Sequence, residues 1–485
     1  TLSHSFSTPD FGNKFWSENM KKLLILFFLI SCTGTEMIRF RDTPSSGYVI
    51  HSVRIFSGRA DRPVQQNMDV HIQNGVIQKI SKTPLQIADA KEIDGKGRVL
   101  MPGLVDFHTH ITAGMFIPWK ASLLPTQDFN LEAAVFSGIT TVVDMSGKET
   151  SEMNSLKKNL EEGKQNGPHL YHSGIGFTAK GGHPVRYLDV VREKIFFLLH
   201  PFIPKIAIEM EENTQDFSAL EKHLAGKPDF TKVYVDKIPE TANLISDDLL
   251  KKIVEKSHSA GVPVVLHIGD NANLASLINS GADGAVHAVY KEKINQNLAR
   301  KLASSGIYVV PTIIVWDNFD KFKNRQSYSH YTSLETATTY PDRLEALKNP
   351  VPEKNKKQDW EEADKKVSEN IPTLFENVRI MKKAGVKMVA GSDSPNYGIS
   401  IGGSLHVELQ NLVKAGFTPA EAIQAATYTP ASILDKNLSF GTVEEGKRAD
   451  LLLVEGDPLK NIKDTENIAE VFVSGRRIER FGRKE

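Results

Sequence analysis

One stretch of the sequence decides the fold: Val99-Leu100-Met101-Pro102-Gly103-Leu104-Val105-Asp106-Phe107-His108-Thr109-His110. The part from Leu104 to Phe107 is apolar apart from Asp106, which predicts a buried strand that ends in two histidines. Because strand side chains alternate with period two, His108 and His110 point to the same side. Two imidazoles at the end of a strand can bind one divalent metal ion. Such pairs also occur without a metal, so further ligands have to come from elsewhere in the chain.

Downstream of this strand, apolar runs alternate with amphipathic helical stretches, which predicts a parallel α/β arrangement. Eight runs have strand character, and eight strand–helix units are the number in a (β/α)8 TIM barrel. The runs cover residues 99–110, 139–144, 169–177, 229–235, 262–267, 284–287, 307–312 and 386–393. A polar stretch at 316–368 interrupts the pattern, and we expect helices there that form a lid or rim over the barrel mouth.

Short strand-like runs flank the barrel pattern on both sides. Residues 47–100 contain alternating strands with a hairpin turn at Asn74-Gly75, and residues 436–485 return to strand character. We therefore expect a barrel inserted in a small two-part β-sandwich. The expected segments are an upstream region with a signal (1–32), a tether (33–46), the first β part (47–100), the barrel (101–435) and the second β part (436–485).

The N-terminal region has the pattern of a bacterial secretion signal. Met20-Lys21-Lys22 is a short basic start, and an apolar run from Leu23 to Ile30 follows. A membrane-spanning helix needs about 20 residues, so this run fits the core of a signal peptide with Met20 as its start. Leu29-Ile30-Ser31-Cys32 resembles a lipobox, which predicts lipidation of Cys32 and an exported, periplasmic, membrane-anchored lipoprotein. Thr33 after the cysteine favours the outer membrane, and a buried N-terminal segment is the alternative interpretation.

Charge and cysteine content limit the partners. The 485 residues include 59 Lys and Arg and 59 Asp and Glu, so the formal net charge is zero. No long basic run with interleaved aromatics points to nucleic acid. Cys32 is the single cysteine, so an intramolecular disulfide cannot form. We expect a small-molecule substrate, no nucleic acid, and membrane contact only through the N-terminal lipid, with a homo-oligomer left open.

Metal-binding residue types end several of the predicted barrel strands, and in such barrels that end is the catalytic face. They are His108 and His110 on strand one, His267 on strand five, His287 on strand six and Asp393 on strand eight. Imidazoles and a carboxylate suit zinc and similar ions, and five of them exceed what one tetrahedral ion needs. Two ions need a bridging ligand. Lys232 on strand four becomes an anionic bridge if carbon dioxide carbamylates it, and a structural or substrate-binding lysine is the alternative.

These motifs together resemble those of the amidohydrolase superfamily, in particular its imidazolonepropionase-like and Xaa-Pro or Xaa-Arg dipeptidase-like branch. The resemblance extends from Val49 to Ile478 and is carried by residues 101–110, 229–232, 267, 287, 390–395, 405–431 and 441–451. It implies two divalent ions, expected to be Zn²⁺. It further implies that His108, His110 and Asp393 hold the first ion, that His267 and His287 hold the second, and that carbamylated Lys232 and a hydroxide bridge both.

The resemblance implies hydrolysis of a C–N amide bond, with a dipeptide as the expected substrate and Asp393 as general base and then general acid. A cyclic amide such as an imidazolone, or an N-acyl amino acid, is the alternative substrate class. A lipoprotein that binds a ligand without catalysis is the alternative from another class. A deaminase is disfavoured, because mononuclear deaminases place a glutamate near the strand-five histidine, whereas Ile268-Gly269-Asp270 follows His267.

Three further side chains are candidates for substrate contact. Gly181-Gly182-His183-Pro184 resembles a Gly-Gly-His-Gly loop of the dipeptidase branch, with a stiffer proline in the last place. Tyr234 lies two residues after Lys232, so it could face the same pocket, and His406 lies on a helix after strand eight. For each of the three, a structural role is the alternative.

Overall fold

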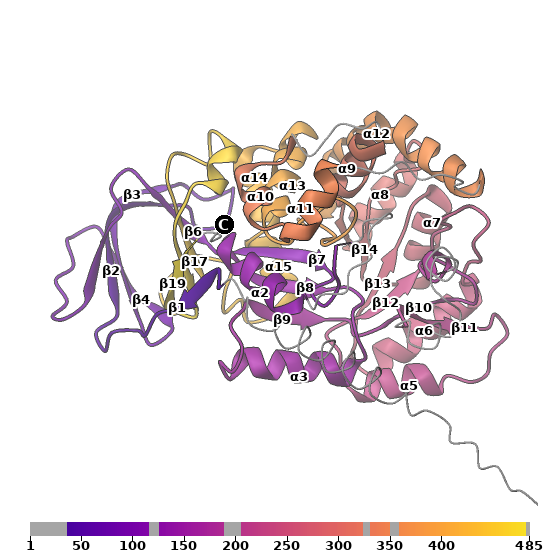
Figure 1. The fold of residues 1–485 in the computed structure, drawn as a ribbon, viewed down its shortest axis with the longest axis horizontal. Helices are drawn as coiled ribbons and strands as arrows, with labels where there is room; N and C mark the ends of the chain where they lie inside the picture. The colour runs from indigo at the N-terminus through magenta and orange to yellow at the C-terminus, as the bar shows by residue number, and fades with distance from the viewer. Residues whose placement is uncertain (1–35, 116–125, 189–204, 324–329, 350–357, 482–485) are drawn as a thin grey trace, which may run out of the picture.

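Strands from both ends of the chain form one nine-stranded sheet in a computed structural model, which describes residues 36–115, 126–188, 205–323, 330–349 and 358–481 (Figure 1). The strand order is β1-β19-β18-β17-β6-β2-β3-β4, with β5 paired to β2. The bounds are β1 Ile38–Phe40, β2 Tyr48–Ile55, β3 Gln65–Gln73, β4 Val76–Ser81, β5 Lys91–Asp94, β6 Val99–Pro102, β17 Leu451–Val454, β18 Ile468–Val473 and β19 Arg476–Arg480. The chain therefore has the β-rich N-terminal domain that the sequence predicts.

Strand β6 connects the two parts of this sheet. It pairs in parallel with β2 and antiparallel with β17, where Leu100 lies opposite Leu453. The apolar side chains of both parts share one buried cluster, which includes Ile50, Val70, Leu100, Leu453 and Phe472. Burying these side chains stabilises the sheet only if the N-terminal and C-terminal strands come together.

The segment 33–46, predicted to be a tether, contains a strand. Ile38 in β1 lies opposite Arg480 in β19, and both Met37 and Ile38 are buried. The prediction was wrong at 38–40 because the apolar pair is too short to show a periodic pattern, yet it completes the edge of the sheet. The predicted signal and the lipobox cysteine Cys32 lie outside the described residues. Within the described ranges, no helix combines the length and the apolar character needed to cross a membrane.

The rest of the chain forms two parallel sheets covered by helices, a mixed α/β arrangement. One sheet has the order β7-β8-β9, and the other β11-β10-β12-β13-β14-β15-β16. The bounds are β7 Leu104–Thr109, β8 Ile139–Asp144, β9 His169–His172, β10 Gly176–Ala179, β11 Ala207–Met210, β12 Thr231–Tyr234, β13 Val264–His267, β14 Gly284–Val286, β15 Tyr308–Val310 and β16 Lys387–Met388.

Backbone hydrogen bonds connect the two parallel sheets at two places. Phe107 N in β7 donates to Ala390 O after β16 at 3.1 Å, and Asp229 N before β12 donates to His172 O in β9 at 2.9 Å. The strands thus follow the order of the predicted (β/α)8 barrel, although their ladders form two sheets and not one continuous sheet.

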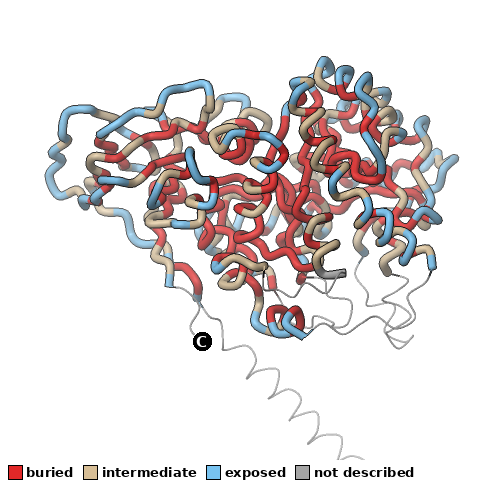
Figure 2. Tube along the Cα trace, turned by 90° about the horizontal axis from the view of Figure 1, so that it is seen from above, coloured by how far each residue is buried: buried red, intermediate tan, exposed pale blue. Residues whose placement is uncertain are grey.

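The helices begin and pack as the sequence directs. They are α2 Gln127–Phe136, α3 Thr150–Glu161, α5 Ser218–Ala225, α6 Asp247–Ser259, α7 Asn271–Ser280, α8 Gln296–Ser305, α12 Gln358–Ala384, α13 Gly403–Lys414, α14 Pro419–Ala425 and α15 Tyr428–Leu434. In α6, Ser246 caps the N-terminus by accepting from Leu249 N, and Leu250, Ile253 and Val254 form a buried stripe. Figure 2 shows buried segments through the middle of the molecule and exposed segments at its outside.

The sequence predicts strand three as one continuous run over 169–177, and the structure differs. It divides into β9 and β10, and β10 pairs with β11 and β12 rather than with β8. Gly174 lies between them with a φ of +60°, a left-handed conformation that ends an extended strand. A side chain at Gly174 would also lie 2.5 Å from Thr150 Oγ1, so the chain turns where only glycine fits.

The polar insertion contains helices, as predicted, in its described parts: α9 Ile313–Lys323, α10 Ser333–Ala337, α11 Pro341–Lys348 and the first half of α12. Helix α9 begins three residues after β15, and Glu408 from α13 fixes this start. The Glu408 carboxylate is fully buried and accepts from Ile313 N at 2.9 Å and from Ile314 N at 2.8 Å. These are first-turn N–H groups, which have no partner within their own helix.

Glu408→Ala should lower the stability of the fold. It removes the acceptor of two buried N–H groups, each of which costs about 1–3 kcal/mol when unpaired. The urea midpoint of unfolding measures the loss. Glu369→Ala, at an exposed glutamate on α12, is the control and should change stability by less than about 0.5 kcal/mol. Equal midpoints for both variants would contradict this role of Glu408.

Candidate metal centre

Two histidines and an aspartate meet where β7 ends and where the segment after β16 passes beside it. His108 Nε2 lies 3.1 Å and His110 Nε2 lies 3.0 Å from Asp393 Oδ1. One donor atom from each of the three side chains lies within 4.8 Å of the others, a spacing at which they could hold one metal ion. The structure thus brings together the three residues predicted as the ligands of the first ion.

Hydrogen bonds between strands one and eight set this spacing. Asp393 N donates to His108 O at 2.7 Å, and His110 N donates to Ser394 O at 2.6 Å. The buried Asp106 carboxylate accepts from Ser392 N at 2.8 Å and from Ser392 Oγ at 2.5 Å. The two strands that carry the ligands are therefore fixed to each other by both backbone and side-chain bonds.

His287 and His267 lie next to this cluster. The ring centroids of His267 and His287 are 4.2 Å apart, and those of His108 and His287 are 5.3 Å apart. The Thr312 hydroxyl donates to Pro311 O and so accepts from His287 Nδ1 at 2.5 Å. Because Nδ1 carries the proton in this bond, Nε2 of a neutral His287 has a free electron pair that can bind a metal ion. This Nε2 lies 3.9 Å from Asp393 Oδ2. His110 follows the same rule, because its Nδ1 lies 2.9 Å from Ser146 O and its Nε2 faces Asp393.

Lys232 is buried beside these histidines. Its exposure is 0%, and its Nζ has no hydrogen-bond partner within the described ranges. The Nζ atom lies 5.3 Å from the ring centre of Tyr234. Burial lowers the pKa of Lys232 to about 7, although Asp393 acts in the opposite direction. A buried ammonium without a partner is costly, so the location favours an uncharged or modified side chain.

The pKa values suit metal binding. Burial lowers the pKa of His108, His267 and His287 well below the ordinary value, so these imidazoles are neutral, which is the form that binds metals. Burial raises the pKa of Asp393, but the hydrogen bond and the charge interaction with His110 outweigh burial and bring the pKa to about 2. The centre therefore offers three neutral imidazoles and an ionised carboxylate at neutral pH. His110 differs: burial lowers its pKa, but the hydrogen bond with Asp393 outweighs burial and the net pKa is raised.

Backbone conformation marks the same strand ends. His287, Thr312 and Asp393 have φ values of 66°, 45° and 58°, which lie in the left-handed region that few side chains adopt. Each such residue costs of order 1–3 kcal/mol unless its surroundings enforce it. The three strand ends are thus held in an unfavourable conformation at the point where their side chains converge.

Of the three candidates for substrate contact, two lie at the centre. The His183 ring is 4.7 Å from the His267 ring and 5.6 Å from the Tyr234 ring, measured between centroids. His406 does not lie there: its Nδ1 contacts Thr465 Oγ1 and its Nε2 contacts Ser137 O, both at 2.9 Å. Both ring nitrogens are thus used in the core, and sequence position on a helix could not reveal this.

Sequence reasoning missed several residues of the site. Thr312 orients His287, and Trp316 lies 5.4 Å from the His287 ring while it stacks on Tyr290 at 3.7 Å. Asp236 is buried with Oδ2 only 3.5 Å from His267 Nε2. Period-two alternation from Lys232 through Tyr234 to Asp236 was the signal that could have found it.

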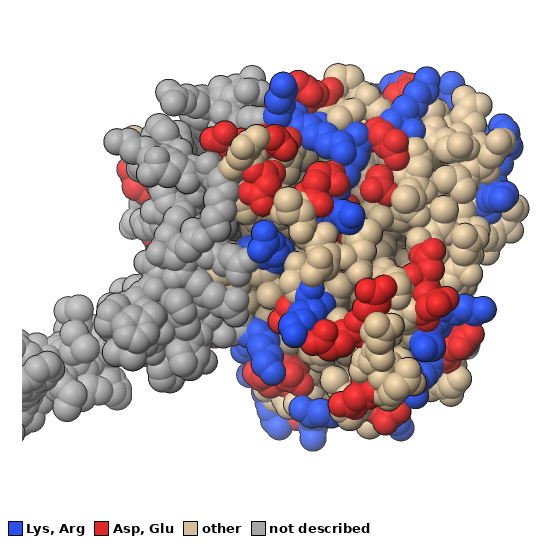
Figure 3. Space-filling view, turned by 90° about the vertical axis from the view of Figure 1, so that its right-hand side faces the viewer, with Lys and Arg blue, Asp and Glu red and all other residues tan. Residues whose placement is uncertain are grey.

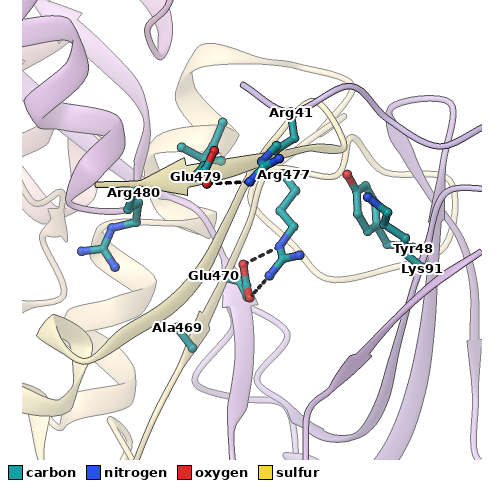
Figure 4. A pocket seen from close by; sticks show the side chains of 9 residues that line it. Arg41, Tyr48, Lys91, Ala469, Glu470, Arg477, Glu479 and Arg480 are labelled. Carbon is teal, nitrogen blue, oxygen red and sulfur yellow. Dashed lines mark hydrogen bonds and ion pairs between the residues drawn. The ribbon is translucent and has the colours of Figure 1, made fainter. Parts of the chain in front are cut away.

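A hollow in the β domain is separate from this centre. It is lined by Arg41, Tyr48, Lys91, Ala469, Glu470, Arg477, Ile478, Glu479 and Arg480 (Figure 4). Arg477 binds Glu470 through two hydrogen bonds of 2.8 and 2.5 Å, and Arg41 binds Glu479 at 2.5 Å. These cations already have carboxylate partners. On the face seen in Figure 3, basic and acidic side chains are interspersed, in agreement with the net charge of zero.

Comparison with known proteins identifies the class. A family model described as the amidohydrolase family matches residues 99–478, and the chain therefore belongs to the amidohydrolase family. It is 24% identical over 435 residues to the imidazolonepropionase of Thermoplasma volcanium, covering 84% of this chain and 90% of that one. It is 24% identical over 272 residues to the enamidase of Eubacterium barkeri, covering 52% of this chain and 66% of the enamidase.

Solved structures share the fold. A Xaa-Pro dipeptidase with methionine bound in its active site has a TM-score of 0.68 and 22% identity, covering 89% of this chain and 99% of that one. Molinate hydrolase has a TM-score of 0.69 and 18% identity, covering 90% and 95%. Family membership and the hydrolase relatives make this protein an enzyme that acts on carbon–nitrogen bonds.

Zn²⁺ should raise the melting temperature of the metal-free protein, because an ion that binds only the folded chain stabilises it by about 2.7 kcal/mol at 100 times its Kd. His110→Ala should reduce this shift, since it removes one of the three clustered donors. His258→Ala, at an exposed histidine paired with Asp283 on the surface, should keep the full shift. A His110→Ala shift equal to that of the unaltered protein would contradict the site.

Proposed function

We propose that the protein is a two-metal amidohydrolase that cleaves the amide bond of a dipeptide inside a closed (β/α)8 barrel. The observation that carries the proposal is the buried Lys232 Nζ, which has no hydrogen-bond partner in the described part of the chain. A carbamylated lysine resolves this problem, because the added group turns an unpaired cation into an anion that two metal ions can share.

The side chains fit two divalent ions. His108, His110 and Asp393 would hold the first, His267 and His287 the second, and carbamylated Lys232 both. Neutral imidazoles and carboxylates are the ligands that Zn²⁺ takes, and the buried His267 Nε2 and Lys232 Nζ have no hydrogen-bond partner in the described ranges. When bound, such ions supply an activated water at neutral pH and polarise the scissile carbonyl.

Asp393 would move the proton in this reaction. Its Oδ2 accepts a hydrogen bond from Asn396 Nδ2 at 3.1 Å, which fixes the carboxylate plane. The carboxylate is ionised at neutral pH and lies at the centre of the ligand cluster, so it can accept the proton of the attacking water. The same carboxyl group can then give that proton to the leaving nitrogen, which must be protonated to depart.

The surrounding side chains favour a substrate with an apolar part. Tyr234, Tyr290 and Trp316 are buried around His267 and His287, and they would exclude water from the reacting bond. His183 lies next to His267 and could donate to or accept from a polar group of the substrate. A dipeptide offers both kinds of group. We further propose, on the sequence pattern alone, that export and lipidation at Cys32 place the enzyme at the outer membrane.

A cyclic amide is the second candidate substrate. The observation in its favour is the similarity to an imidazolonepropionase along 84% of this chain, at 24% identity. Both candidates use the same centre and differ in the bond that is opened, so substrate assays separate them.

Purified protein supplied with Zn²⁺ and bicarbonate should hold about two ions per chain and hydrolyse dipeptides faster than other amides. The measurement is elemental analysis together with kcat/KM for dipeptides, N-acyl amino acids and an imidazolone under one set of conditions. Faster opening of the imidazolone would favour the second candidate. Full dipeptide hydrolysis by the metal-free protein would contradict the proposal altogether.

Lys232→Ala should lower kcat/KM by at least about 100-fold, because the bridging anion is lost. Acetate or propionate should restore part of the activity by occupying the space of the carbamate. His110→Ala is the matched control, since it removes an imidazole, whose place and shape a small carboxylate does not reproduce. Restoration in both variants, or in neither, would contradict carbamylation of Lys232.

A further inference from the structure

A second buried aspartate lies beside the proposed second ion. Asp236 comes two residues after Tyr234, the last residue of β12, and is only 1% exposed. Val235 N donates to His267 O at 3.1 Å, so the segment that carries Asp236 is held against the end of the neighbouring strand β13, where His267 lies. The Asp236 carboxylate therefore lies at the same end of the sheet as the metal-ligating residues.

The two oxygens of Asp236 have different surroundings. Oδ1 accepts from Lys237 N at 2.8 Å and lies 2.7 Å from Lys291 Nζ. Oδ2 accepts from the Tyr290 hydroxyl at 2.7 Å and lies 3.5 Å from His267 Nε2. A carboxylate can accept about four hydrogen bonds, so Oδ2 can take a further partner besides the Tyr290 hydroxyl. Lys291 thus holds Oδ1 and Tyr290 holds Oδ2, and Oδ2 lies near His267 Nε2 as well.

The separation of Oδ2 and His267 Nε2 is that of two ligands on one ion. Zinc binds nitrogen and oxygen at about 2.0–2.2 Å, and two tetrahedral ligands at that distance are about 3.4 Å apart. His267 Nε2 is buried and has no hydrogen-bond partner within the described residues. His267 Nε2 and the Asp236 oxygen are thus spaced to share a cation.

A glycine leaves room for this carboxylate. A Cβ atom at Gly269, two residues after His267, would lie 2.4 Å from Asp236 Oδ2 and 2.6 Å from both Oδ1 and Cγ. Gly269 O also accepts from Tyr290 N at 3.0 Å and from Lys291 N at 3.1 Å. The loop that follows His267 therefore forms a space for Asp236 and holds the two residues that bind it.

The neighbours of Asp236 keep it in place. Burial and Asp236 raise the pKa of Tyr290 well above its ordinary value, so the phenol remains a hydrogen-bond donor. Lys291 Nζ also lies 3.3 Å from Glu240, which binds Lys366 of α12 at 3.0 Å. This chain of charges runs from the metal centre to the surface, and it neutralises part of the negative charge that two nearby carboxylates would create.

We propose that Asp236 is a further ligand of the second metal ion, through Oδ2 and next to His267. The inference rests on the proposed function, because it requires that a second ion binds. It adds an anionic ligand to His267, His287 and the Lys232 bridge, and so makes the second ion harder to remove.

Zinc titration of the metal-free full-length protein in bicarbonate tests the inference, with a chromophoric chelator as competitor to give the Kd of each equivalent. Asp236→Asn should weaken the second equivalent by about 10–100-fold or more and leave the first unchanged. Gly269→Ala should act in the same direction, since its methyl group displaces the carboxylate while every ligand is kept. Glu240→Gln, which alters the other carboxylate on Lys291, is the matched control and should change neither Kd.

Asp236→Asn also leaves Lys291 without this carboxylate partner, which could weaken metal binding for a different reason. A double variant separates the two effects. Asp236→Asn combined with Lys291→Met leaves no unpaired cation and should still bind the second equivalent weakly. If the unaltered protein binds two ions and Asp236→Asn binds both with unchanged Kd, the inference is overturned while the proposed function stands. If the unaltered protein binds only one ion, the two-metal function fails and the inference fails with it.

Discussion

The hydrogen bonding between β7 and the segment that follows β16 is the constraint on which the centre depends. His108 lies in β7 and His110 directly follows it, and Asp393 comes from a segment 283 positions further along the chain than His110. Their donor atoms meet because Asp106 binds Ser392 and because backbone bonds connect His108 to Asp393. These bonds are buried, so they are not exchanged for bonds to water, and losing one leaves a costly unpaired group.

Burial then determines the chemistry of the side chains that meet. Burial lowers the pKa of His108, His267, His287 and Lys232, and these nitrogens lie around one ionised carboxylate. Neutral nitrogen atoms do not repel an arriving cation. This arrangement requires unfavourable backbone conformations, because His287, Thr312 and Asp393 are left-handed. The orienting bonds from Thr312 and Ser146 fix which nitrogen of each histidine is free.

Periodicity made much of this predictable. Alternation with period two placed His108 and His110 on one face, and strand–helix repetition indicated which ends would converge. The same strand-end pattern indicated Lys232, His267 and His287, which the structure brings next to the first cluster, and the family resemblance implied how they divide between two ions. The break at Gly174 and the short strand β1 were not predicted, because each depends on contacts with distant residues. Gly174 lies against Thr150, and β1 pairs with β19. His406 and Asp236 show the same limit, since a side chain's partners across the fold decide whether it serves the core or the centre.

The central claim is that the strand ends hold two ions, and diffraction from zinc-loaded crystals at the zinc absorption edge tests it most directly. The account predicts two anomalous peaks per chain, one among His108, His110 and Asp393 and the other beside His267 and His287, with continuous density from Lys232 between them. A single peak at the first position, with unmodified density at Lys232, would contradict the account.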